Sequence, residues 1–155
     1  MTNTTAITTN IWLCLGAIGS FSVSALHVYV IAKGAEAYRY FGAGEDFARG
    51  AEAGAWFPAL ATSGIVVIFA VLGVYALAGA GILRGLSQIQ FPQMRLVILG
   101  TGIVYTLRGL LLFAELAMSL NIFSWRDGVR SQDPYFSAVS LALGIVHLVG
   151  WRMLK

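Results

Sequence analysis

The chain has 155 residues, of which 58% are hydrophobic and only 11% are charged. A soluble domain carries about 25% charged residues, so this composition excludes an ordinary water-soluble enzyme and indicates lipid as the main solvent. The formal charge of +3 comes from scattered basic residues that form no run, so we expect a membrane partner and no nucleic acid.

Four apolar segments are long enough to cross a bilayer, which requires about 20 mostly apolar residues each. They cover residues 11–35, 57–83, 96–120 and 135–153, with short connections between them. We therefore expect an all-α fold, in which residues 1–155 form a single integral membrane domain of four antiparallel transmembrane helices. The single cysteine, Cys14, lies in the first span and excludes an intramolecular disulfide.

In the first span, small and polar residues recur at alternating steps of four and three. They are Gly16, Ser20, Ser24, His27, Ile31, Gly34 and Tyr38. Small residues on one face let a neighbouring helix approach closely. The following connection, residues 38–56, predicts an interfacial turn and a short amphipathic helix, with Phe41 and Phe47 as anchors. Its charged residues Glu45, Asp46, Arg49 and Glu52 are expected to face water.

The second span has Thr62, Ser63 and Tyr75 as its polar side chains and ends at Gly79 and Gly81, where we expect tight packing or a kink. A short basic turn, residues 84–95, then predicts that the second and third spans are antiparallel neighbours.

The third span carries two ionisable residues, Arg108 and Glu115, on one helical face. That face also contains Thr101, Tyr105, Leu112 and Ser119. An arginine within hydrocarbon costs roughly 2.5–3.5 kcal/mol on insertion scales, so we expect it to face a bundle interior, a partner or water. Arg108 and Glu115 are two turns apart, so we expect another group to bridge them, either His27 or a bound polar or anionic ligand.

The fourth span begins at Asp133 and Pro134, which predict an N-cap followed by the first helical position. Trp125 to Gly128 predict a turn before it. Its small and polar face contains Ser137, Ser140, Gly144, His147 and Trp151.

Helical rise gives the depth of the candidate site residues. From the side of the termini, His27 lies ~24 Å deep and Arg108 ~20 Å deep, whereas His147 lies only ~8 Å deep. A haem held by two histidines requires both at one level, so this cofactor is disfavoured; we expect no cofactor and no shared metal site. A polar pocket in the outer half is predicted instead. Its residues are His27, Lys33, Thr62, Ser63, Tyr105, Arg108 and Glu115.

The stretch Val74 to Gly81, VYALAGAG, and the stretch Tyr105 to Gly109, YTLRG, resemble small four-span proteins of bacterial inner membranes that are usually labelled uncharacterised. The resemblance implies a multi-pass protein of the inner membrane and brings no function with it. An even number of spans places both termini on one side, and the basic turn at residues 84–95 favours the cytoplasm for them.

The favoured function is a non-catalytic accessory or assembly subunit of a membrane complex, which docks on a protein partner or a second copy through glycine, alanine and serine faces. One alternative is a binder or transporter of a small or amphipathic ligand in the outer polar pocket. Another is a lipid- or quinone-modifying enzyme, with His27 and Glu115 as acid and base and Arg108 as an anion clamp. Arg108 and Glu115 could also do no more than cross-link helices.

Overall fold

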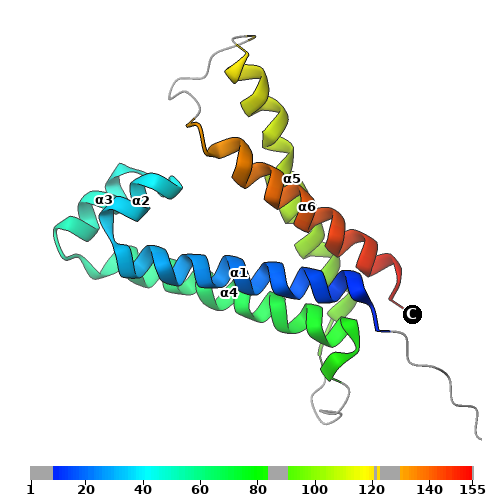
Figure 1. Cartoon of the computed structure of the whole chain (residues 1–155). Coiled ribbons are helices and arrows are strands. Elements are labelled where there is room, and N and C mark those ends of the chain that lie inside the picture. The colour runs from blue at the N-terminus through cyan, green and yellow to red at the C-terminus, as the bar shows by residue number, and fades with distance from the viewer. Residues whose placement is uncertain (1–8, 84–90, 121, 123–129, 155) are drawn as a thin grey trace, which may run out of the picture. The chain divides into compact units, whose positions relative to one another are not determined.

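The computed structural model describes residues 9–83, 91–120, 122 and 130–154. These residues are almost entirely helical and include no strand. The helices in chain order are α1 (Ile11–Lys33), α2 (Ala35–Phe41), α3 (Glu45–Glu52), α4 (Trp56–Ala80), α5 (Met94–Ser119) and α6 (Asp133–Arg152) (Figure 1).

Four of these helices, α1, α4, α5 and α6, are long and apolar enough to cross a membrane. Each overlaps one of the four predicted spans, and its ends lie within three residues of the predicted ones. The all-α fold class is therefore confirmed, and the protein is a multi-pass integral membrane protein in contact with a lipid bilayer.

The chain divides into two compact units, Ala17–Val74 on the one hand and Met1–Gly16 with Tyr75–Lys155 on the other. We call them the 17–74 unit and the terminal unit. The division falls within α1 and α4, so each unit contains a part of both helices.

In the 17–74 unit, the second part of α1 packs antiparallel to the first part of α4. The hydroxyl of Ser24 donates a hydrogen bond to the carbonyl oxygen of Val66 over 2.9 Å. Near the other end of this contact, the ring of Phe21 lies so close to Gly73 that an added Cβ would meet its Cε1 at 2.9 Å. Gly73, which the sequence did not single out, therefore allows a close helix contact here.

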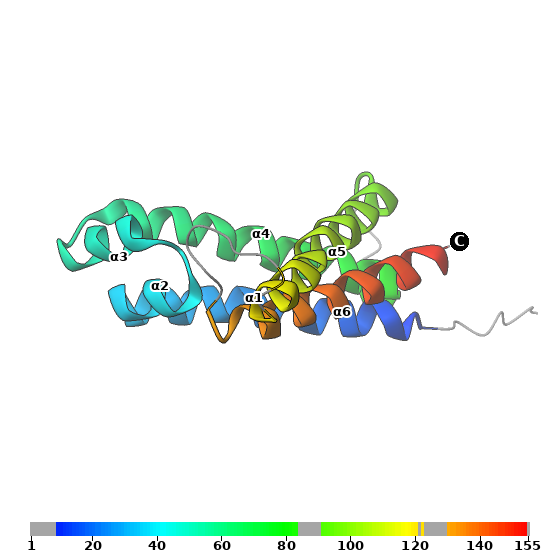
Figure 2. The same ribbon diagram turned by 90° about the horizontal axis from the view of Figure 1, so that it is seen from above.

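The first connection contains two short helices, α2 and α3, which lie side by side (Figure 2). The predicted amphipathic helix is α3; α2 was not predicted. Gly34 (φ 72°) separates α1 from α2, and Gly42 (φ 81°) ends α2 in the left-handed conformation that favours glycine. A sharp break in direction after α1 therefore produces a helical hairpin where the sequence suggested a turn.

The hairpin packs on the end of α1 around an apolar core that consists of Val30, Ala37, Tyr38 and Ala48. Phe41 and Phe47, the predicted membrane anchors, are half-buried against this core. The aromatic residues exposed nearby are instead Tyr40, Trp56 and Phe57. The predicted charged residues of α3 are exposed, as expected.

In the terminal unit, the ends of α1, α4, α5 and α6 meet around Leu13, Ala80 and Ile98, which are fully buried. Asn10 caps α1, because its side-chain oxygen accepts a hydrogen bond from the Leu13 amide at 3.3 Å. Its side-chain nitrogen donates to the carbonyl of Gly150 at 2.8 Å. The beginning of the first span and the end of the last span therefore lie together. Residues 84–90 of the predicted basic turn and the predicted turn at residues 125–128 lie outside the described residues.

Helices α5 and α6 run side by side in opposite directions (Figure 1). A Cβ added to Gly109 would collide with the backbone of Leu141, and a Cβ added to Gly144 would collide with the backbone of Thr106. Such contacts bring the two helix backbones unusually close. Gly144, predicted on the small and polar face of the fourth span, is thus used for packing within the chain, and so is Gly109, which was not predicted as a packing residue.

At the start of α6, the predicted N-cap at Asp133 is wrong by one residue. Gln132 holds the N-cap position, and Asp133 lies in the first turn together with Pro134. The Asp133 carboxylate turns back and accepts a hydrogen bond from the amide of Arg130 at 3.0 Å. It therefore ties the preceding chain to the helix rather than capping it.

We expect Gly109→Ala to destabilise the terminal unit by about 1–3 kcal/mol, because the new methyl group overpacks the contact with Leu141. Thermal unfolding in a mild detergent measures the change. Gly100→Ala is the matched control, since nothing lies within 4 Å of its added Cβ and alanine is the better helix former. Equal stability of the two variants would contradict the close contact.

Candidate functional site

An arginine, a serine and a glutamate form one polar network between α5 and α6 of the terminal unit. The Nη1 of Arg108 donates a hydrogen bond to Oγ of Ser137 over 2.5 Å. The hydroxyl of Ser137 donates in turn to Oε1 of Glu115 over 2.9 Å. The same Nη1 lies 3.8 Å from that carboxylate oxygen. We call these three residues the Arg108 network.

The two charged ends of the Arg108 network differ in exposure. Glu115 is only 8% exposed, and its second oxygen, Oε2, is buried without a hydrogen-bond partner in the part of the chain that the structure describes. The side chain of Arg108 is 43% exposed, and its contacts with Ser137 and Glu115 use only Nη1. The network therefore has a buried acid and a guanidinium that partly faces outward.

The helix contact explains why these residues meet. Gly109, directly after Arg108, brings α6 close enough for Ser137 to lie between the two charges. The bridge expected from the spacing of Arg108 and Glu115 is thus formed by Ser137, whereas the sequence suggested His27 or a ligand. The long side chains also extend toward each other, so the charges come closer than two helical turns suggest.

His147 and Tyr105 form a second contact between α5 and α6. The two rings pack with their centroids 5.5 Å apart. The Nδ1–H of His147 donates to the carbonyl of Leu143 at 2.8 Å. The other ring nitrogen, Nε2, is buried, and the ring lies against Gly16, where an added Cβ would meet it at 2.9 Å. The contact is a packing arrangement of the type expected for a buried histidine.

The remaining predicted site residues lie in the 17–74 unit. Thr62 is buried and donates to the carbonyl of Pro58 at 2.8 Å, so the hydroxyl of Tyr38, 3.2 Å away, donates to it. His27 contacts the carbonyl of Val23 at 2.8 Å, within its own helix. Its ring also packs on Phe69. Thr62 and Tyr38 thus attach α2 to α4.

Lys33 and Ser63 complete the predicted set. Lys33 is exposed at the end of α1, with its ammonium group 5.9 Å from the centre of the Tyr29 ring. Ser63 is half-buried on α4. The structure thus joins Arg108 to Glu115 and places Tyr105 on the same helix. The predicted pocket that would include His27, Lys33, Thr62 and Ser63 as well stays a prediction.

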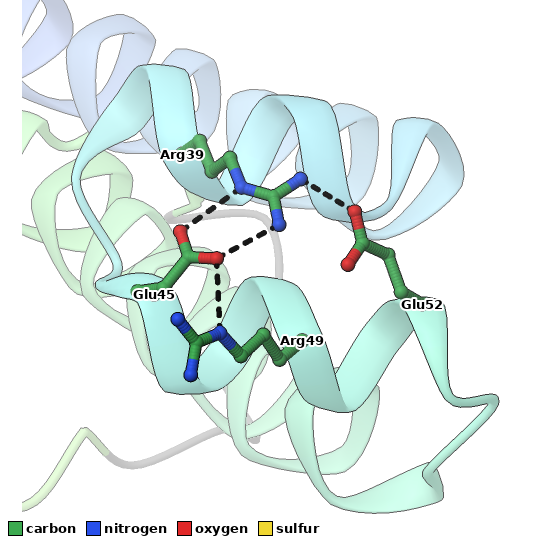
Figure 3. Close-up of polar contacts among 4 residues, drawn as sticks. All are labelled: Arg39, Glu45, Arg49 and Glu52. Atoms are coloured by element: carbon green, nitrogen blue, oxygen red, sulfur yellow. Dashed lines mark hydrogen bonds and ion pairs between the residues drawn. The ribbon is translucent and has the colours of Figure 1, made fainter.

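A separate ionic cluster holds α2 against α3 at the surface (Figure 3). Arg39 forms two hydrogen bonds to Glu45, at 3.0 and 2.9 Å, and a third to Glu52 at 2.6 Å. Arg49 reaches the same Glu45 carboxylate at 3.2 Å. We call this set the Arg39 cluster; it links the two short helices.

The Arg39 cluster shifts the titration of its members. The hydrogen bonds from Arg39 lower the pKa of Glu45 from 4.5 to about 2 and lower the pKa of Glu52 as well. They also raise the pKa of Arg39 above its ordinary value. All three groups are at the surface, so solvent screens their interaction. The cluster therefore positions the hairpin and offers no buried reactive group.

Comparison with protein-family models, with curated proteins and with solved structures gives no match to this chain. Function is therefore inferred from the residues themselves. The Arg108 network is the candidate site, because ionisable groups inside membrane spans are rare and mark functional positions by default. It can bind an anion through its guanidinium and can accept a hydrogen bond at Glu115.

We expect Arg39→Gln to raise the pKa of Glu45 from about 2 toward 4.5, because the hydrogen bonds from Arg39 are the largest cause of its depression. Carbon-13 NMR titration of labelled glutamate carboxyls in micelles measures the shift. The depressed pKa also means that Glu45 stabilises the hairpin fully above pH 4.5 and loses this contribution as the pH falls toward about 2.

Arg49→Gln is the control for that titration, because Arg49 has a smaller effect on the same carboxylate. It should raise the pKa of Glu45 less than Arg39→Gln does. A larger effect of Arg49→Gln would mean that Arg39 does not hold the two helices together.

Proposed function

We propose that the protein binds a small polar or amphipathic ligand within the membrane, through the Arg108 network. The observation that carries the proposal is the half-exposed guanidinium of Arg108, which the chain's own carboxylate and hydroxyl bind at only one nitrogen. Arg108 lies eleven residues before the end of α5 at Ser119, which is ~16 Å along the helix axis.

The cost of a charge in lipid supports this proposal. A guanidinium that faces hydrocarbon is unfavourable unless a partner, water or a polar group covers it. Glu115 and Ser137 hold Nη1 inside the helix pair, which prevents the side chain from extending freely to the membrane surface. A ligand with hydrogen-bond acceptors would complete the coordination of the remaining nitrogens.

A role as accessory or assembly subunit is the second candidate. It was suggested by small residues on the helix faces, but Gly102, Gly109 and Gly144 of α5 and α6 pack within the chain. On α4, by contrast, an added Cβ at Gly64 would meet nothing within 4 Å, and Leu60 beside it is exposed. If the protein is an accessory subunit, these contacts favour a partner helix that docks on α4 at Gly64.

The enzyme alternative, in which His27 and Glu115 act on one substrate as acid and base, is the third candidate. A location in a bacterial inner membrane with cytoplasmic termini is part of the proposal and depends on the sequence resemblance and on the basic turn. Arg95, the last residue of the predicted turn, lies in the first turn of α5 and donates a hydrogen bond to the carbonyl of Leu154 at 2.6 Å.

We expect Arg108→Leu to remove a bound small molecule from the purified protein, because its charged donor is lost. The same change leaves Glu115 buried without its ion, so it should also lower stability, typically by about 3–5 kcal/mol. The double variant Arg108→Leu/Glu115→Leu removes both charges and should recover most of that stability. It should still lack the ligand.

Native mass spectrometry of protein extracted in mild detergent measures the bound mass, and thermal unfolding measures the stability. The double variant distinguishes ligand binding by Arg108 from a purely structural role of the Arg108–Glu115 pair. It should restore the stability of the contact between α5 and α6 without restoring the charge that binds the ligand. A bound molecule that persists in the double variant would refute binding at Arg108. A wild-type protein that carries no molecule from any extraction and binds none when it is added would also refute it.

For the assembly candidate, we expect Gly64→Leu to release a partner subunit while the protein itself stays folded, because the larger side chain fills the open position on α4. Native electrophoresis of the detergent extract measures the size of the complex. Gly100→Leu on α5 is the control. A wild-type protein that migrates as a lone monomer without crosslinking excludes this candidate.

A further inference from the structure

We infer that the ligand is an amphipathic anion, with its acid group on the outward face of the Arg108 guanidinium and its apolar body along an exposed strip of α5. The strip consists of Val104, Leu107 and Leu111. The inference depends on the proposed function and specifies the chemical class of the ligand. A carboxylate or phosphate joined to an acyl chain has this chemistry, whether as a free fatty acid or as an anionic lipid.

The free donors of Arg108 determine the charge of the ligand. A guanidinium has five N–H donors in a planar fork. In the described part of the chain, the partners of Arg108 are Ser137 and Glu115, and both bind through Nη1. The donors on Nη2 and Nε are left, and their geometry matches the two oxygens of a carboxylate or phosphate.

The carboxylate of Glu115 does not remove the need for an anion. Its Oε1 lies 3.8 Å from Nη1, which is longer than a direct hydrogen bond, and the hydroxyl of Ser137 lies between them. Glu115 is also buried, so it does not reach the outward face of the guanidinium. Glu115 and Ser137 are therefore positioning residues, and Arg108 is the residue that contacts the ligand.

The exposed apolar strip beside Arg108 indicates that the rest of the ligand is apolar. Val104, Leu107 and Leu111 lie four residues before, one before and three after Arg108, so they border it on the helix surface. They are 66%, 61% and 50% exposed. Lipid tails are as apolar as leucine, so an acyl chain replaces lipid on this strip with little gain or loss. The acid group therefore supplies most of the affinity, and chain length should matter little.

The test uses the full-length protein in a neutral maltoside detergent, titrated separately with oleate, with phosphatidylglycerol and with methyl oleate as the uncharged control. Native mass spectrometry counts the bound molecules. We expect saturable binding of oleate, of phosphatidylglycerol or of both, and no saturable binding of methyl oleate. Saturation by oleate alone identifies a free fatty acid, and saturation by phosphatidylglycerol alone identifies a lipid headgroup.

Two variants of Arg108 test the contact. Arg108→Gln should weaken anion binding about tenfold or more, because a charge-assisted bidentate contact is lost. Arg108→Lys keeps the charge without the planar fork and should weaken binding less. Arg49→Gln, at an exposed surface arginine, should bind as the wild type does. Thermal unfolding of each variant confirms that it is folded.

Glu115→Gln separates positioning from direct contact. The amide oxygen still accepts the hydrogen bond from Ser137, and a negative charge near the anion is removed. Anion affinity should therefore stay equal or rise, whereas a carboxylate that bound the ligand itself would make affinity fall. A fall in affinity for Glu115→Gln overturns the assigned roles.

Equal binding of the anions by the wild type and by folded Arg108→Gln overturns the inference, and so does binding of methyl oleate as strong as that of oleate. A bound molecule that Arg108→Leu loses, but that is not an amphipathic anion, overturns the ligand class and leaves the proposed function standing. A wild-type protein that binds neither anion and carries no molecule refutes both.

Discussion

The close contact of α5 and α6 at Gly109 and Gly144 sets the geometry of the polar groups between these helices. Without side chains at these two positions, the helix backbones approach closely enough for one serine hydroxyl to join two charges. In a bilayer, water cannot replace such a partner, so an ion pair in a span depends on neighbouring helices. The candidate site is therefore a consequence of backbone packing as much as of its charged residues.

The spans and the polar face of α5 could be predicted because they depend on local signals. Hydropathy determines which segments enter the membrane, and helical periodicity places Arg108 and Glu115 on one face. Glycine and proline gave further local signals, such as the tight packing at Gly79, where Leu13 and Ile98 lie close. These signals require no knowledge of how one helix is aligned with the next.

The bridge by Ser137 could not be predicted, because it depends on the alignment of α6 along α5. Ser137 was noted on a polar face, but several residues of that face could have reached Arg108. The use of the glycines within the chain was missed for the same reason. The helix α2 was missed because backbone breaks with positive φ at Gly34 and Gly42 place it beside α3, where Arg39 can bind two glutamates.

The hydrogen bond from Asn10 to Gly150 has a consequence for the order in which the protein is made. It joins residues that are 140 positions apart, so the terminal unit is complete only after ribosomal synthesis has released the last span. The 17–74 unit is one continuous segment, and its contacts are available as soon as α4 is inserted. The contacts of the 17–74 unit can therefore form before those of the terminal unit, and only the beginning of the first span has to wait for the last span to be inserted.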